Sequence, residues 1–174
     1  MEFFLVIMFM GIFLAVIILI AIGMSGVNRL PDILEGATLF KNEENLRIYD
    51  PINLSGRPDQ VWKSKSEKLV IVDTKVRQNN QVYESDRIQL SAYAVMLKNH
   101  PLSKNMEVHP VGYIRRHTSG GGQYIAVQLY PEEKVIELHE RYWQVHDQEI
   151  PPKTNGGSAL CHHCGHRKTC VKFN

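Results

Sequence analysis

Hydrophobic residues fill the beginning of the chain without interruption and follow shorter periods further along. The segment from residue 3 to residue 24 comprises 22 residues, none of them charged. A helix of this length spans about 33 Å, enough to cross the roughly 30 Å hydrocarbon layer of a membrane. A helix without any polar face is not typical of a soluble domain. The pattern therefore predicts a transmembrane anchor within residues 1–26.

A cleaved signal peptide is the alternative for this segment. The two preceding residues carry no positive side chain, and the run is longer than the apolar region of about 7 to 15 residues in signal peptides. Arg29 and Lys41 follow the run, whereas Glu2 precedes it. Positive residues flank membrane helices on the cytoplasmic side. We therefore expect a single-pass protein of the cell membrane, with a linker at 27–45 and a cytoplasmic C-terminal domain.

Shorter patterns in residues 46–147 predict alternating strands and helices. Strands are predicted at residues 46–49, 57–63, 69–76, 107–117 and 123–130. The second and third of these flank a polar stretch and are expected to form a hairpin. Helices are predicted over residues 86–99 and from Pro131 onward, the latter with Val135, Leu138, Tyr142 and Val145 as its core face. This order favours an α/β fold with a mixed central sheet flanked by helices.

Composition excludes several other classes of protein. The chain has 20 Lys and Arg, 18 Asp and Glu, and a formal net charge of +2, which excludes a strongly basic tail and an acidic solvating chain. It is 44% hydrophobic, with only 12 glycines and 8 prolines, which excludes collagen-like and disordered chains. A local basic groove remains compatible with this balance.

Asp59, Asp73 and Lys75 give the sharpest chemical signal. Asp59 lies near the start of the predicted hairpin and Asp73 near its end, so the two carboxylates would meet at one edge of the sheet. Asp73 and Lys75 are two residues apart on a strand and share a face. Converging carboxylates suit Mg²⁺ or Mn²⁺, which activate water and stabilise a phosphate undergoing substitution. The alternative is a turn aspartate beside a surface ion pair, but placing charges directly after so apolar a strand is costly.

Gln89 and Tyr93 are a polar pair among the apolar stripes of the predicted helix 86–99. Their spacing of four places them on one face, one turn apart. They would reach toward a metal site or a DNA phosphate; alternatively, Tyr93 is an amphipathic core residue and Gln89 its hydrogen-bonding neighbour.

These residues together resemble a known nuclease family. The run from Leu54 to Asp59, the triplet at 73–75 and the run from Gln89 to Tyr93 have the motif order of RecB-like nucleases in the PD-(D/E)XK superfamily. The chain resembles in particular the CRISPR-associated exonucleases with a C-terminal iron–sulfur cysteine cluster, over about residues 45 to 172.

The resemblance implies a restriction-endonuclease-like core and a set of roles. Asp59 and Asp73 would be metal ligands, with the Thr74 carbonyl as a third; Lys75 would be the catalytic lysine, and Gln89 and Tyr93 the supporting helix motif. The implied reaction is metal-dependent hydrolysis of DNA phosphodiesters, often exonucleolytic and on single strands or free ends.

The chain departs from this family at its N-terminal side. The family carries a helical portion there, with an active-site His or Glu and the first cluster cysteine, where this chain has the apolar segment. Glu35, Glu43 and Glu44 are candidates for the missing acid without an assignment, and no cysteine precedes Cys161. This departure motivates a second hypothesis, a catalytically inactive nuclease-like module that binds DNA or a partner.

Residues 148–174 form a linker and a Cys/His-rich segment with metal-site spacing. Cys161, Cys164 and Cys170 enclose three histidines at 162, 163 and 166. Thiolate and imidazole suit Zn²⁺ or an iron–sulfur cluster, and a cytoplasmic location keeps thiols reduced. Three cysteines and one His would complete a zinc site; the resemblance favours [4Fe–4S] with a His or an external fourth ligand. Free surface thiols are the alternative, and a membrane-bound metal or redox sensor is a third hypothesis for function.

Basic residues occur where a nucleic acid would pass. Arg115, Arg116 and His117 close a predicted strand, and Arg167, Lys168 and Lys172 surround the cysteines. Phosphate contacts need such charges, although each residue alone is equally compatible with a solvated edge.

Overall fold

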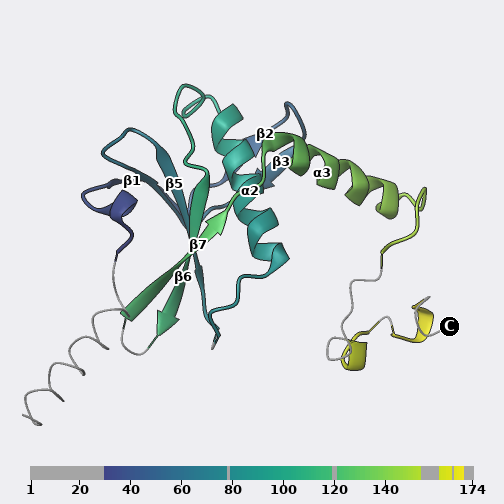
Figure 1. Cartoon of the computed structure of the whole chain (residues 1–174). Coiled ribbons are helices and arrows are strands. Elements are labelled where there is room, and N and C mark those ends of the chain that lie inside the picture. Colours follow the sequence, from purple (N-terminus) through teal and green to yellow (C-terminus); the bar gives the residue numbers. More distant parts are fainter. Residues whose placement is uncertain (1–29, 78, 119–120, 154–160, 166, 171–174) are drawn as a thin grey trace, which may run out of the picture. The chain divides into compact units, whose positions relative to one another are not determined.

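The computed structural model describes residues 30–77, 79–118, 121–153, 161–165 and 167–170 (Figure 1). The expected transmembrane segment lies outside these residues. Among the helices that are described, none is both long and apolar enough to cross a membrane. The chain divides into two compact units, Met1–Val135 and Ile136–Asn174, which are treated separately.

The first unit contains a five-stranded mixed sheet with the order β1-β4-β5-β6-β7. The strands are β1 (Thr38–Asn42), β4 (Gln60–Lys63), β5 (Leu69–Lys75), β6 (Val111–Thr118) and β7 (Gly121–Gln128). β5 and β6 are parallel, whereas the other neighbouring pairs are antiparallel. The helix α2 (Glu84–Asn99) makes the crossover that a parallel pair requires. The expected mixed α/β fold and the hairpin of β4 and β5 are confirmed.

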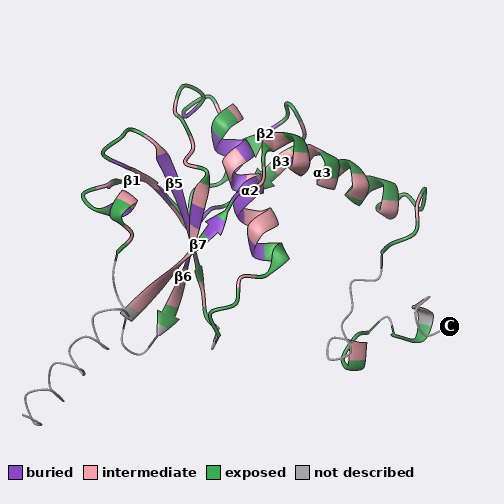
Figure 2. Cartoon of the chain, in the orientation of Figure 1, coloured by how far each residue is buried: buried purple, intermediate pink, exposed green. Residues whose placement is uncertain are grey.

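β5 is the centre of the core because it is covered on both faces. Leu69 and Ile71 pack in the main hydrophobic cluster together with residues of α2, which lies along one face of the sheet (Figure 1). Val70 and Val72 point the other way and pack with Leu34, from the short 3-10 helix η1 (Asp32–Leu34). The near-continuous apolar run of β5 is therefore the pattern of a strand buried on both sides. Figure 2 shows this burial in purple along β5 and on α2.

A separate two-stranded hairpin of β2 (Leu46–Ile48) and β3 (Leu54–Gly56) packs against α2. Leu46 and Ile48 are buried in the main cluster, and Arg47 between them is exposed. A Cβ atom at Gly56 would lie 2.9 Å from Cε1 of Tyr93, closer than non-bonded carbon atoms approach. Gly56 is therefore needed for the close contact between the hairpin and α2.

Two strands have no counterpart in the sequence pattern. Residues 38–42, expected to belong to a linker, form β1, whose only buried side chain is the charged Lys41, so a hydrophobic alternation is missing. The strand expected at 57–63 begins only at Gln60, since Pro58 lacks the N–H group that a ladder needs. The second strand without a counterpart is β3, formed by residues 54–56, which precede the expected strand.

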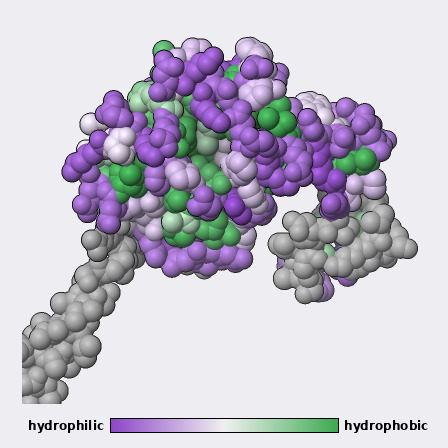
Figure 3. All heavy atoms as spheres, turned by 45° about the horizontal axis from the view of Figure 1, so that its top comes forward, coloured by the Kyte–Doolittle hydropathy of each residue, from purple (hydrophilic) through white to green (hydrophobic). Residues whose placement is uncertain are grey.

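The helix α3 (Glu132–His146) begins as expected, but its expected core face is wrong beyond the first turn. Val135 is its one buried residue and packs in the main cluster. Leu138 and Val145 are only partly buried, and Tyr142 is 61% exposed. Helical spacing identified the apolar stripe, but spacing alone does not show whether the stripe is buried; Figure 2 shows α3 mostly in the colours of intermediate and exposed residues. The face of the molecule in Figure 3 is largely hydrophilic, with hydrophobic side chains in small separate patches.

Asp86 fixes the beginning of α2 to the segment that follows β5. Its carboxylate accepts two hydrogen bonds from the Arg77 guanidinium, at 2.7 and 2.8 Å, and one from the Tyr83 N–H group at 2.9 Å. The hydrogen bonds from Arg77 are the main cause that lowers the pKa of Asp86 below its usual range. The carboxylate is buried, so the ionised form depends on these partners.

Replacing Asp86 by Asn is expected to lower the free energy of unfolding by about 2 kcal/mol at neutral pH, the typical worth of a charged hydrogen-bonded pair. A lowered folded-state pKa stabilises the fold above the unfolded value of about 3.9, and this stabilisation is lost as the pH falls through the folded value. The difference in the free energy of unfolding between wild type and variant, measured by urea unfolding, should therefore be smaller at acidic than at neutral pH. Asp147→Asn, at an exposed site, is the control, and a pH-independent difference would contradict the assignment.

Candidate active site

The hairpin of β4 and β5 brings Asp59 to the end of β5. Asp59 lies one residue before β4, and its Oδ2 accepts a hydrogen bond of 2.7 Å from the Thr74 N–H group. Antiparallel pairing of Gln60 with Val72 sets this register. The two carboxylates of Asp59 and Asp73 thus meet at one edge of the sheet, as the hairpin predicted.

Asp73 is a buried carboxylate with incomplete hydrogen bonding. Its side chain is 3% exposed, and Lys75 Nζ lies 2.7 Å from Oδ2. This ion pair does not have hydrogen-bond geometry, so among the described residues Oδ2 accepts no well-directed hydrogen bond. Burial raises the pKa of Asp73, Lys75 counteracts this, and the charge of Asp59 raises the pKa further. The negative charge of Asp73 is therefore only partly compensated by Lys75.

Gln89 and Tyr93, both on α2, connect the lysine to the segment between β3 and β4. Lys75 Nζ donates to Gln89 Oε1 at 2.9 Å, and Gln89 Nε2 donates to Tyr93 Oη at 2.9 Å. Nε2 also lies 3.5 Å from Asp73 Oδ1. The Tyr93 hydroxyl donates to the Arg57 carbonyl at 3.1 Å. Gln89 and Tyr93 therefore hold the Lys75 side chain in position and have their effect through that side chain.

The oxygen atoms of this edge fit a hard divalent cation. Asp73 Oδ2 is buried without a directed donor, and the nearby charge of Asp59 destabilises its ionised form. Carboxylate oxygens that converge in this way suit Mg²⁺ or Mn²⁺, which keep several waters and need few protein ligands. Within the described residues, no group of three or more His, Cys, Asp or Glu is arranged to hold a metal ion. A site here would therefore consist of two carboxylates completed by a carbonyl and water.

The three glutamates before β4, which are candidates for the missing acid, have different surroundings. The Glu43 N–H group donates to the Asp59 carbonyl at 2.9 Å, and Glu43 has a positive φ of 50°. The Glu44 carboxylate is paired with the buried Lys41, and Glu35 is exposed after η1. Glu43 is thus the one whose backbone is held directly against Asp59.

The basic end of β6 lies beside the same edge. Parallel pairing places Arg115 opposite Thr74 and Arg116 opposite Lys75. Paired residues of neighbouring strands share a face, so Arg116 is on the face of Lys75. Its guanidinium donates to Gln123 Oε1 at 2.8 Å. This basic run is evident from the sequence, but its register with the lysine is not, because that register depends on the crossover through α2.

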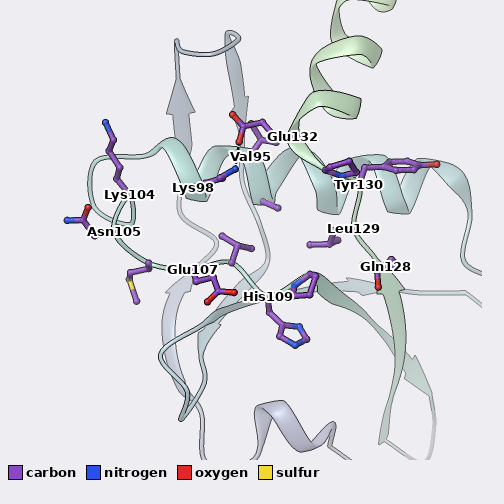
Figure 4. Close-up of a pocket in the computed structure, with 15 residues that line it drawn as sticks. Val95, Lys98, Lys104, Asn105, Glu107, His109, Gln128, Leu129, Tyr130 and Glu132 are labelled. Atoms are coloured by element: carbon purple, nitrogen blue, oxygen red, sulfur yellow. Dashed lines mark hydrogen bonds and ion pairs between the residues drawn. The ribbon is translucent and has the colours of Figure 1, made fainter.

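The pocket in Figure 4 lies at the opposite end of β5. It is bordered by the segment 104–110, which pairs with Leu69 at the start of that strand, whereas the carboxylates follow its end. Two of its charged side chains, Lys98 and Glu132, form an ion pair of 2.7 Å. This pocket is therefore not part of the candidate active site.

The three cysteines belong to the second unit. Cys161, Cys164 and Cys170 have free thiols, and the Cys164 N–H group lies 3.5 Å from the Cys161 carbonyl. A short 3-10 helix, η2 (Arg167–Thr169), precedes Cys170. His166 lies outside the described residues, so the expected ligand set is only partly described.

Comparison with known proteins assigns the chain to a family. A comparison with curated proteins finds no match. A solved structure titled "Crystal structure of SSO0001" is similar at 14% sequence identity and a TM-score of 0.46, covering 82% of this chain and 64% of that chain. This chain thus spans less than two thirds of the length of that relative. The family described as "PD-(D/E)XK nuclease superfamily" matches residues 24–171, and the chain belongs to this superfamily.

Proposed function

We propose that the protein is a divalent-metal-dependent deoxyribonuclease of the RecB-like type that acts as an exonuclease. The observation that carries this proposal is the edge of β5, where Asp59, Asp73 and Lys75 lie together in a nuclease superfamily fold. Asp73 and Asp59, with the Thr74 carbonyl, would hold Mg²⁺ or Mn²⁺. When bound, the cation would lower the pKa of a water molecule and withdraw charge from the scissile phosphate.

The side chains around the carboxylates have separate tasks in this proposal. The Lys75 ammonium places positive charge at the reacting phosphate and stabilises charge that develops in the transition state. Gln89 accepts a hydrogen bond from Lys75 and so fixes its position, while Tyr93 fixes Gln89. Gln89 and Tyr93 are therefore positioning residues.

The test is cleavage by the full chain in detergent. Linear single-stranded, linear double-stranded and closed circular DNA are incubated with Mg²⁺, with Mn²⁺ or with chelator. An exonuclease is expected to degrade linear DNA to short products, only with metal, and to leave closed circles intact. Binding without cleavage under all conditions would instead support the inactive nuclease-like module.

We further propose that residues 3–24 anchor the protein in the cell membrane with the nuclease domain in the cytoplasm. The apolar length of the segment and the positive residues that follow it support this orientation. The domains would be an anchor at 1–26, a short linker, the nuclease core and the C-terminal metal-binding segment from residue 148.

The C-terminal segment is proposed to bind its own metal through Cys161, Cys164 and Cys170. Their spacing with three histidines supports either a [4Fe–4S] cluster or Zn²⁺. The segment would gain most of its folding free energy from the metal, because metal binding and folding are coupled in segments with little core.

Cys164→Ser is expected to lower the content of this metal and the thermal stability of the second unit together. The protein is purified without oxygen or chelator and analysed for iron, sulfide and zinc. Absorbance near about 400 nm with iron would identify the cluster, and colourless protein with one zinc per chain the alternative. Asp73→Asn is the control, since it should retain this metal. Wild-type protein that contains neither metal would refute the site.

A further inference from the structure

Residues of the β2–β3 hairpin and the two residues that flank it line a groove that the catalytic assignments do not use. It has a volume of about 420 Å³. Six residues line it: Asn45, Leu46, Arg47, Ser55, Gly56 and Arg57. Leu46 is buried, whereas Arg47, Ser55 and Arg57 are exposed. The hairpin thus turns its apolar side to α2 and its cationic side outward.

The charge of the groove is unbalanced. Arg47 pairs in register with Ser55, Arg57 follows Ser55 by two residues, and both arginines line the same groove. None of the six described lining residues is acidic. Guanidinium groups bind phosphate oxygens in bidentate geometry, and the Ser55 hydroxyl and Asn45 amide add further donors. The Arg47 guanidinium also lies 5.7 Å from the ring centroid of Tyr49, a side chain that is 72% exposed. Phosphate-binding cations beside an open aromatic ring are typical of surfaces for single-stranded nucleic acid.

The groove is joined to the candidate active site by both covalent and hydrogen bonds. Arg57 is two residues from Asp59, so their Cα atoms are at most about 7 Å apart. The Arg57 carbonyl accepts the hydrogen bond from Tyr93, which ends the series that starts at Lys75. Gly56 permits the close approach of the hairpin to Tyr93. The position of the groove is therefore set by the same residues that position the lysine.

We propose that this groove binds the phosphodiester backbone of a single DNA strand and guides it to Asp59. The inference rests on the proposed nuclease function and adds the substrate's path. Adjacent phosphates of a strand are separated by about the length of one or two residues of extended chain, so a phosphate held by Arg57 leaves a neighbouring one beside Asp59. Arg47 would hold the strand further out.

The test is binding of a fluorescent single strand of about 20 nucleotides to the full chain in detergent and chelator, where cleavage does not occur. Arg47→Ala combined with Arg57→Ala is expected to weaken binding at least about 10-fold. The loss of two phosphate contacts should also reduce the slope of log K against log salt by about 1.4, at about 0.7 per contact for single strands. Arg47→Lys with Arg57→Lys keeps the charges and should retain most of the salt slope.

Lys65→Ala combined with Lys104→Ala is the matched control. It removes the same charge from the exposed β4–β5 turn and the loop after α2, at the other end of β5. An equal loss of binding in this control would show a general charge effect and overturn the groove. Binding by the double arginine variant with unchanged affinity and salt slope would overturn it as well.

Kinetics separates this proposal from the nuclease assignment. Arg47→Ala alone, which leaves the hydrogen-bond series from Lys75 to Arg57 untouched, should raise the KM for the long strand without lowering kcat. It should cleave a nitrophenyl ester of thymidine monophosphate as the wild type does. That ester offers one phosphodiester and has no second phosphate for the groove to bind. A variant that loses the ester activity would refute the groove as a separate binding element, whereas a wild type without cleavage but with arginine-dependent binding would refute only the nuclease.

Discussion

Asp73→Asn is expected to reduce metal-dependent DNA cleavage at least about 100-fold while leaving the fold intact. The substitution removes the charge of a buried carboxylate whose Oδ2 lacks a directed hydrogen bond among the described residues. A comparable loss accompanies the removal of one group that stabilises transition-state charge. Initial rates on linear DNA with Mn²⁺ give the measurement. Lys75→Ala is expected to give a loss of the same order.

The melting temperature tests the same site independently of catalytic activity. Burial raises the pKa of Asp73, so its ionised form costs stability at neutral pH in the absence of metal. Asp73→Asn should therefore melt at the same temperature as the wild type or higher in chelator. Added Mn²⁺ should raise the melting temperature of the wild type but not of the variant, because a ligand of the folded state stabilises it.

Lys104→Ala is the control for Lys75→Ala, since Lys104 is exposed in the loop after α2. It should retain activity and melting behaviour. Full activity in both Asp73→Asn and Lys75→Ala would remove these residues from the mechanism. A lower melting temperature for Lys75→Ala alone is expected, because the substitution leaves the buried Asp73 carboxylate without its partner.

The convergence of Asp59 and Asp73 was predictable because it depends on local structure. One hairpin determines it, and a polar turn between two apolar strands is readable from sequence. The position of Gln89 and Tyr93 on one helix face follows from the helical period. These parts of the site require only short-range rules.

The remaining parts depend on contacts between distant segments. The pairing of Lys75 with Arg116 is set by a parallel register after the α2 crossover, which no local pattern specifies. The acceptor for Tyr93 is a backbone carbonyl, at Arg57, so no side chain signals it. β1 lacks apolar alternation, and its position comes from pairing with β4. The edge with the candidate catalytic residues was therefore readable from the sequence, whereas the groove and β1 were not.

The second large expected effect concerns the anchor. The full-length protein should remain in the membrane fraction after washing with concentrated salt, whereas a variant lacking residues 3–24 should be soluble. Apolar burial does not weaken with ionic strength, in contrast to charge attraction at a lipid surface. Western blotting of washed membranes and supernatant gives the measurement.

A point variant keeps the length of the segment and tests its apolar character. Ile17→Arg combined with Ile18→Arg places two charges near the middle of the run, each costing about 2.5 to 3.5 kcal/mol in a membrane helix. This variant should shift to the soluble fraction, whereas Ile17→Leu with Ile18→Leu should not. Protease outside intact cells should spare the C-terminal domain. A soluble product shortened by the apolar segment would show instead that the segment is a cleaved signal peptide, because only cleavage both removes the anchor and releases the domain.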